Sequence, residues 1–187
     1  MEIENNLIDI QKSCDDFIAQ NFAEILVELE QNKVNITMPF PDFKADKLQK
    51  KSWGVYVFYI TPENTITTYE DLNNLWQNKE DQRLHSPKAI KGRFEILNSG
   101  KQCCLYVGKS ENLVSRISQH IHQKTKHTTY GLKLSKHDTL SQHCGFSYSY
   151  YVIKENPPIK YKDSMKCLLV TLERHLRNKL EPLIGKQ

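Results

Sequence analysis

The sequence predicts an α+β fold in which helices surround a small β-sheet. Three segments are rich in aromatic and β-branched residues, which are typical of strands, at 53–60, 104–107 and 145–153. In other, longer segments apolar residues recur every three or four positions, as they do on one face of a helix. Because helices and strands are mixed along the chain without an internal repeat, we expect one small sheet with helices packed around it.

Helical periodicity is clearest in three segments. In 6–32 the face opposite the apolar stripe is acidic, so this helix is expected either to cover the sheet or to form a dimer contact. The segment 111–123 follows Ser110, a residue type that favours the N-cap position. The segment 164–180 stops just before Pro182, which cannot continue a helix.

The remaining segments carry weaker signals. Prolines and a run of lysines make 33–52 an irregular connection, and 124–143 is polar, basic and loop-like. Within 61–103, apolar residues at 72–76 mark a short amphipathic helix, and 93–98 is a candidate strand.

Composition restricts the class of protein. The chain has 187 residues, of which 39% are hydrophobic and 26% charged, as in soluble globular proteins of one domain. The longest apolar run, 53–60, is far shorter than the roughly 20 residues of a membrane-spanning helix. The first residues lack the pattern of a secretion signal, and the five cysteines form no CxxC pair. We therefore expect a cytoplasmic protein with reduced thiols, no disulfide frame and no zinc site.

Charge is distributed unevenly along the chain. Residues 1–82 have a net charge of −8, whereas residues 83–137 have a net charge of +9 and contain five histidines. A basic middle segment beside an acidic one favours a polyanionic partner for the middle segment. Solvated surface lysines are the alternative explanation of the same composition.

Two short motifs and three single residues carry the chemistry. Gly-Val-Tyr at 54–56 lies inside the first strand, and Tyr-Val-Gly at 106–108 ends the second. Arg116 and His120 are four positions apart on the following helix, so they share one face. Glu173 lies far downstream, within an otherwise apolar stretch of the last helix.

In this order and spacing the motifs resemble the GIY-YIG nuclease superfamily, over roughly 53–60 and 104–187. The resemblance implies a small three-stranded antiparallel sheet flanked by helices. It also implies metal-dependent hydrolysis of a DNA phosphodiester bond. The nuclease domain would span 53–187 with an insert at 61–103, preceded by an N-terminal helix and connection at 1–52.

The resemblance also implies roles for five residues. Glu173 would bind Mg²⁺ or Mn²⁺ through a hard carboxylate oxygen. Arg116 offers phosphate oxygens a planar, permanently charged set of donors. Tyr56 and Tyr106 would line the site, with Tyr56 orienting or deprotonating the attacking water. His120 would accept or relay the proton.

A further set of basic residues forms the candidate DNA surface. Its members lie in the insert, directly after the second motif and in the loop at 122–133: Lys88, Lys91, Arg93, Lys109, Lys124, Lys126 and Lys133. The alternative for the insert is a structural element that packs on the sheet.

The expected protein is therefore a magnesium-dependent DNA endonuclease of the restriction type. Because the family has one active site per chain, cleavage of both strands would favour a homodimer. Gly185 lies near the position where many family members carry an asparagine. The alternatives are a structure-specific repair or mobile-element nuclease and a catalytically inactive DNA-binding module.

Overall fold

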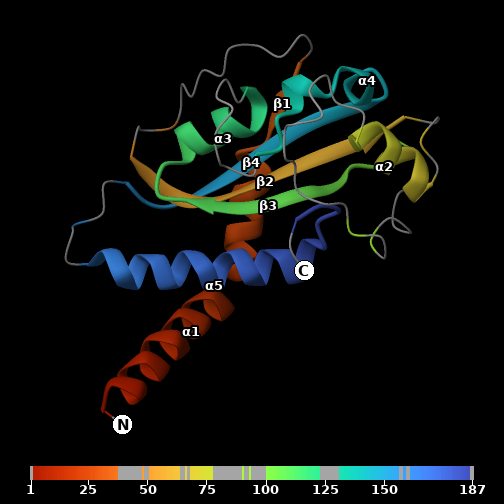
Figure 1. Cartoon of the computed structure of the whole chain (residues 1–187). Coiled ribbons are helices and arrows are strands. Elements are labelled where there is room, and N and C mark those ends of the chain that lie inside the picture. The colour runs from red at the N-terminus through yellow and green to blue at the C-terminus, as the bar shows by residue number, and fades with distance from the viewer. Residues whose placement is uncertain are drawn as a thin grey trace.

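The computed structural model describes residues 2–37, 48, 51–63, 66, 68–77, 90, 93, 100–122, 131–155, 158 and 161–185. An antiparallel sheet of four strands, in the order β1-β4-β2-β3, lies between two layers of helices (Figure 1). The α+β prediction and the N-terminal helix are confirmed. Among the described residues, no helix has the length and apolar character needed to cross a membrane.

The centre of the sheet is β2, Ser52–Pro62, which pairs with β3, Cys103–Ser110, and with β4, Cys144–Glu155. These are the three strands that the sequence predicts. The expected number of strands is nevertheless wrong, because β1, Val34–Ile36, pairs with β4 inside the segment predicted to be irregular. This strand has only three residues and is largely exposed, so neither an apolar run nor a clear alternation marks it in the sequence.

Helices cover both faces of the sheet. One face carries α5 and α1, and the other carries α3 with shorter helices (Figure 1). The bounds of the helices are α1 Glu2–Gln31, α2 Tyr69–Gln77, α3 Leu113–His122, the 3₁₀ helix η2 Leu134–Lys136, α4 Asp138–Ser141 and α5 Lys162–Leu180.

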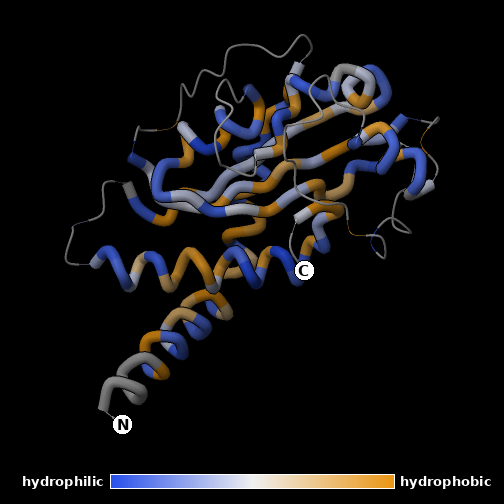
Figure 2. Tube along the Cα trace, viewed as in Figure 1, coloured by the Kyte–Doolittle hydropathy of each residue, from blue (hydrophilic) through white to orange (hydrophobic). Residues whose placement is uncertain are grey.

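Successive side chains of β2 enter two different cores, because side chains alternate between the faces of a strand. Val55 and Val57 pack with α1 and α5, whereas Tyr56 and Phe58 pack on the α3 side. Apolar residues accordingly concentrate in the strands and on the sides of the helices that face them (Figure 2). Tyr56 is therefore a residue of the α3 face of the sheet.

Two details of the sequence prediction are wrong. The helix after β3 begins after Asn112 rather than Ser110, because Asn112 Oδ1 accepts the Ser115 N–H at 3.0 Å while Ser110 still belongs to β3. The predicted loop at 124–143 contributes to the core over its described part, 131–143. The buried apolar residues there are Leu132, Leu134 and Leu140. Of the candidate strand at 93–98, residues 94–98 lie outside the described residues.

The segment that follows α5 covers the outer edge of β3. The Leu183 N–H donates to the Cys104 carbonyl and the Ile184 N–H to the Leu105 carbonyl, both at 3.0 Å. These bonds give partners to two backbone carbonyls of β3 at the edge of the sheet. They also place Gly185 so that a Cβ there would lie 3.7 Å from the Tyr106 ring.

Candidate active site

The Tyr56 hydroxyl lies against α3 and contacts two of its side chains. His120 Nε2 is 2.8 Å from the hydroxyl oxygen, and Arg116 Nε donates to it at 3.3 Å. Tyr56 is 1% exposed and His120 is fully buried, whereas Arg116 is partly exposed. The structure thus brings together three residues that are up to 64 positions apart in the chain.

The tautomer of His120 follows from its second contact. The backbone N–H of Leu132 donates to His120 Nδ1 at 3.0 Å, so a neutral ring must carry its proton on Nε2. Burial and the nearby Arg116 charge keep the pKa of His120 well below its usual value, so the ring is neutral at physiological pH. His120 therefore donates to the Tyr56 oxygen. In this tautomer it cannot accept the tyrosine proton, which differs from the expected relay.

The two tyrosines lie on neighbouring strands of the sheet. Their rings stack with centroids 6.2 Å apart. Burial raises the pKa of both hydroxyls, and the neighbouring Tyr106 raises the pKa of Tyr56 further. The Arg116 charge offsets only part of the rise in each pKa. Both are neutral phenols in the free protein, and the Tyr56 oxygen is held by two N–H donors.

Lowering the pH is expected to destabilise the fold through His120. The unfolded chain takes up a proton on this histidine as the pH falls through about 6.5, whereas the buried ring does not. The free energy of unfolding should therefore fall below pH 6.5, by up to about 1.4 kcal/mol per pH unit for this group. Urea unfolding of wild type and His120→Gln at several pH values checks this. Equal pH slopes for the two proteins would contradict it.

The glycine of the second motif makes room for the Tyr56 hydroxyl. A Cβ at Gly108 would lie 2.3 Å from Tyr56 Oη and 2.9 Å from the Tyr106 ring. The first motif requires glycine at position 54 for a different reason. A Cβ at Gly54 would lie 2.0 Å from the Tyr151 carbonyl oxygen. Each motif therefore has a glycine because a neighbouring strand or side chain occupies the space of a Cβ.

Replacing Gly108 with alanine is expected to displace the Tyr56 side chain from its two N–H donors. A Cβ at this position overlaps the hydroxyl and its ring carbon, and neither can move without breaking the contact with the buried His120. Overpacking of this kind costs about 1–3 kcal/mol of unfolding free energy. Thermal unfolding and the NMR signal of the His120 ring measure the two effects. An unchanged ring environment would show that Tyr56 is not held as described.

Glu173 reaches the same cluster from α5. Its carboxylate forms an ion pair with the Lys109 ammonium of β3, rather than with Arg177 one helical turn away. The Glu173 charge raises the pKa of both Tyr56 and Tyr106, in addition to the larger effect of burial. Its side chain is only 16% exposed. The residues Tyr56, Tyr106, Lys109, Arg116, His120 and Glu173 are called the tyrosine cluster below.

The cluster offers one carboxylate to a metal ion. Among the described residues there is no group of three or more histidine, cysteine, aspartate or glutamate side chains that could hold a metal. Mg²⁺ commonly binds through one or two carboxylates and keeps several waters, so a single partly buried glutamate suits this ion and does not suit zinc. The ammonium of Lys109 on the Glu173 carboxylate shows that this position already attracts a cation.

The candidate DNA-binding residues that the structure describes lie in three different environments. Lys109 belongs to the cluster, Lys133 is only 4% exposed, and Arg93 Nη1 donates to the Pro182 carbonyl at 2.9 Å. Lys88, Lys91, Lys124 and Lys126 lie outside the described residues. The contact of Arg93 with the segment after α5 is a structural role, and burial separates Lys133 from solvent.

Two contributors to the site were missed from the sequence. The backbone N–H of Leu132 fixes the His120 tautomer, and the types of residue in the sequence do not indicate such a backbone contact. Arg177 lies one turn after Glu173 on α5, and its charge lowers the pKa of Tyr106. The spacing of four residues from Glu173 was the available signal for Arg177.

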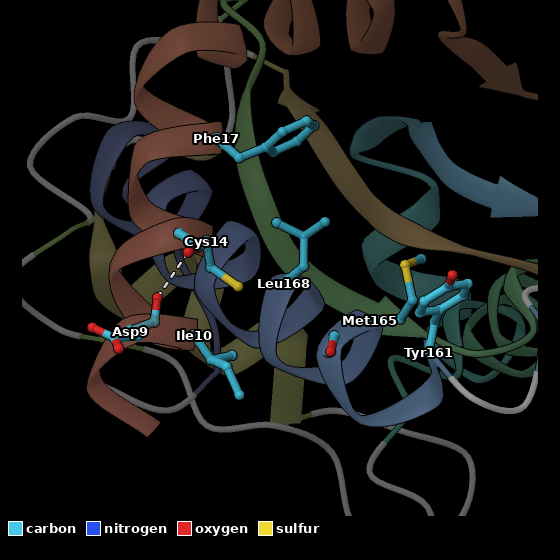
Figure 3. Close-up of a pocket in the computed structure, with 9 residues that line it drawn as sticks. Asp9, Ile10, Cys14, Phe17, Tyr161, Met165 and Leu168 are labelled. Atoms are coloured by element: carbon cyan, nitrogen blue, oxygen red, sulfur yellow. Dashed lines mark hydrogen bonds between the residues drawn. The ribbon is translucent and has the colours of Figure 1, made fainter. Parts of the chain in front are cut away.

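A hollow lies away from the tyrosine cluster, between the N-terminal part of α1 and the beginning of α5 (Figure 3). Its walls are mainly apolar, with Ile10 and Phe17 from α1 and Met165 and Leu168 from α5. It contains no residue of the tyrosine cluster. The groove is therefore an apolar surface and not part of the candidate active site.

No protein-family model, curated protein or solved structure matches the chain.

Proposed function

We propose that the protein is a metal-dependent DNA endonuclease that hydrolyses phosphodiester bonds, with a restriction-like activity. The observation that carries the proposal is the contact of the Arg116 guanidinium with the Tyr56 hydroxyl, together with the effect of the Glu173 charge on the pKa of that hydroxyl. A phosphodiester needs three things at one place: an oriented water, positive charge on the phosphate oxygens and assistance to the leaving oxygen. Tyr56 orients the water, Arg116 supplies positive charge to the phosphate oxygens, and a metal ion on Glu173 would assist the leaving oxygen.

In this proposal Glu173 holds Mg²⁺ or Mn²⁺. The ion, when bound, supplies charge stabilisation at the phosphate and at the leaving 3′ oxygen. The Lys109 ammonium, which pairs with Glu173 in the free protein, would contact the phosphate if the carboxylate held the ion instead. A cation already held by the carboxylate supports this exchange.

Arg116 binds the phosphate oxygens through its guanidinium, while its Nε keeps the bond to Tyr56. Tyr56 orients the attacking water as a neutral phenol, since burial holds its pKa above the usual value. His120 keeps the Tyr56 oxygen in place by donating from Nε2. Tyr106 lies beside Tyr56 and closes that side of the cluster.

The restriction-like subtype includes a homodimer, because one cluster per chain cuts one strand. Four large apolar side chains of α1 are exposed, which supports this helix as the contact between two copies: Ile8, Ile10, Phe17 and Val27. Bases would be read by the segment between β2 and β3, whose part 83–93 is rich in basic residues.

Incubation with plasmid and phage DNA, in Mg²⁺ or in EDTA, tests the proposal. Discrete fragments that require Mg²⁺ support the restriction-like activity, and mapping of the cut ends gives the recognised site. Nicks confined to junctions or flaps would instead indicate a structure-specific nuclease. Binding without any cleavage would indicate a DNA-binding module that lacks activity, as the glycine in place of an asparagine at 185 would suggest.

A further inference from the structure

Arg177 lies next to the tyrosine cluster on a side that the proposed mechanism does not use. It is partly buried on α5, one turn after Glu173. Its Nη2 is 3.5 Å from the point where a Cβ of Gly185 would lie, and a carbon of the Tyr106 ring is 3.7 Å from the same point. The guanidinium and the Tyr106 ring therefore both border the position that a side chain at Gly185 would take.

The side chain of Arg177 makes no hydrogen bond or ion pair with any residue that the structure describes. Its natural helix partner, the carboxylate four positions earlier, is already paired with Lys109. A partly buried guanidinium without a carboxylate is unfavourable, because it has lost some water without gaining a partner. Such a group is suited to an anion that binds later.

Arg116 and Arg177 belong to helices on opposite faces of the sheet. Arg116 belongs to α3 and Arg177 to α5, and the charges of both act on the Tyr106 hydroxyl (Figure 1). Gly185, at φ +130°, has no side chain that would extend toward the Arg177 guanidinium. The space next to the guanidinium is thus kept free of a side chain by a residue whose conformation favours glycine.

We propose that Arg177 is a second phosphate-binding arginine, which contacts a DNA phosphate beside Tyr106 while Arg116 contacts the scissile one. This inference rests on the proposed nuclease function and adds a residue to its DNA-contacting surface. A guanidinium matches phosphate oxygens with two parallel N–H donors, which a lysine does not reproduce.

The test compares Arg177→Gln with Lys179→Gln, a matched control that removes one positive charge from an exposed position of the same helix. Binding of a short labelled DNA duplex is measured in EDTA between about 50 and 200 mM salt. For Arg177→Gln the slope of log affinity against log salt should decrease in magnitude by about 0.9, the value for one phosphate contact, and the control should keep the wild-type slope. Equal slopes for the two variants would overturn the inference.

A second measurement uses the wild-type protein and does not depend on the folding of a variant. Phenylglyoxal modifies accessible arginines, and mass spectrometry locates the modified residues with and without DNA. DNA should protect Arg177 and leave Arg174, which is exposed three positions earlier, as reactive as before. Equal modification of Arg177 with and without DNA would overturn the inference. Loss of DNA binding by the wild type would instead overturn the proposed function itself.

Discussion

Replacing Glu173 with glutamine is expected to abolish Mg²⁺-dependent DNA cleavage while DNA binding is retained. The amide has nearly the same shape but no charge, so it neither holds the metal ion nor pairs with Lys109. Because a metal contributes several kcal/mol of charge stabilisation to the transition state, cleavage should slow by about a thousandfold or more. Single-turnover cleavage of a plasmid at saturating protein measures the loss.

A matched control for this variant is Glu111→Gln, which removes an exposed carboxylate near the beginning of α3. Its cleavage rate should stay within a few-fold of the wild type. Folding of both variants is checked by thermal unfolding. Because Lys109 is 35% exposed, the loss of its partner should lower stability only slightly. Cleavage by Glu173→Gln at the wild-type rate would remove Glu173 from the proposed metal site.

Replacing Tyr56 with phenylalanine is expected to slow cleavage by about 10²–10³-fold, because the hydroxyl orients the attacking water. The change also affects stability. Without the hydroxyl, the buried Nε2–H of His120 loses its acceptor, at a cost of about 1–3 kcal/mol in unfolding free energy. Cleavage is therefore measured well below the unfolding temperature of the variant.

Tyr59→Phe separates catalysis from packing. Tyr59 is on the same strand and loses a comparable hydrogen bond, to Ser149 Oγ at 3.1 Å. It packs with the core on the α1 and α5 side, away from His120. This variant should lose stability without losing cleavage activity. A wild-type cleavage rate for Tyr56→Phe would assign Tyr56 to packing alone.

The regular elements of the fold were predictable because their sequence patterns are local. The aromatic and β-branched run of β2 and the apolar stripe of α5 each lie in one continuous segment. The strand β1 was missed because its three residues are ordered by pairing with β4, which is more than 100 positions away. Short edge strands depend on such contacts rather than on their own composition.

The candidate site was predictable as a set of residues but not as a set of contacts. Helical spacing places Arg116 and His120 on one face, and the structure brings both to the Tyr56 hydroxyl. Spacing cannot reveal that Lys109 pairs with Glu173, since these residues belong to different elements. It also cannot reveal which nitrogen of His120 carries the proton, because a backbone N–H at Leu132 decides this.

In the proposed complex, one DNA phosphate lies between Arg116 and a metal ion on Glu173. A crystal structure of the Tyr56→Phe variant with duplex DNA and Mn²⁺ tests it most directly, because Mn²⁺ is located by its anomalous scattering. We expect an anomalous peak bound to a Glu173 carboxylate oxygen, with Lys109 released and a phosphate hydrogen-bonded to Arg116. A peak at another position, or DNA bound away from Arg116 with the Lys109 ion pair intact, would contradict it.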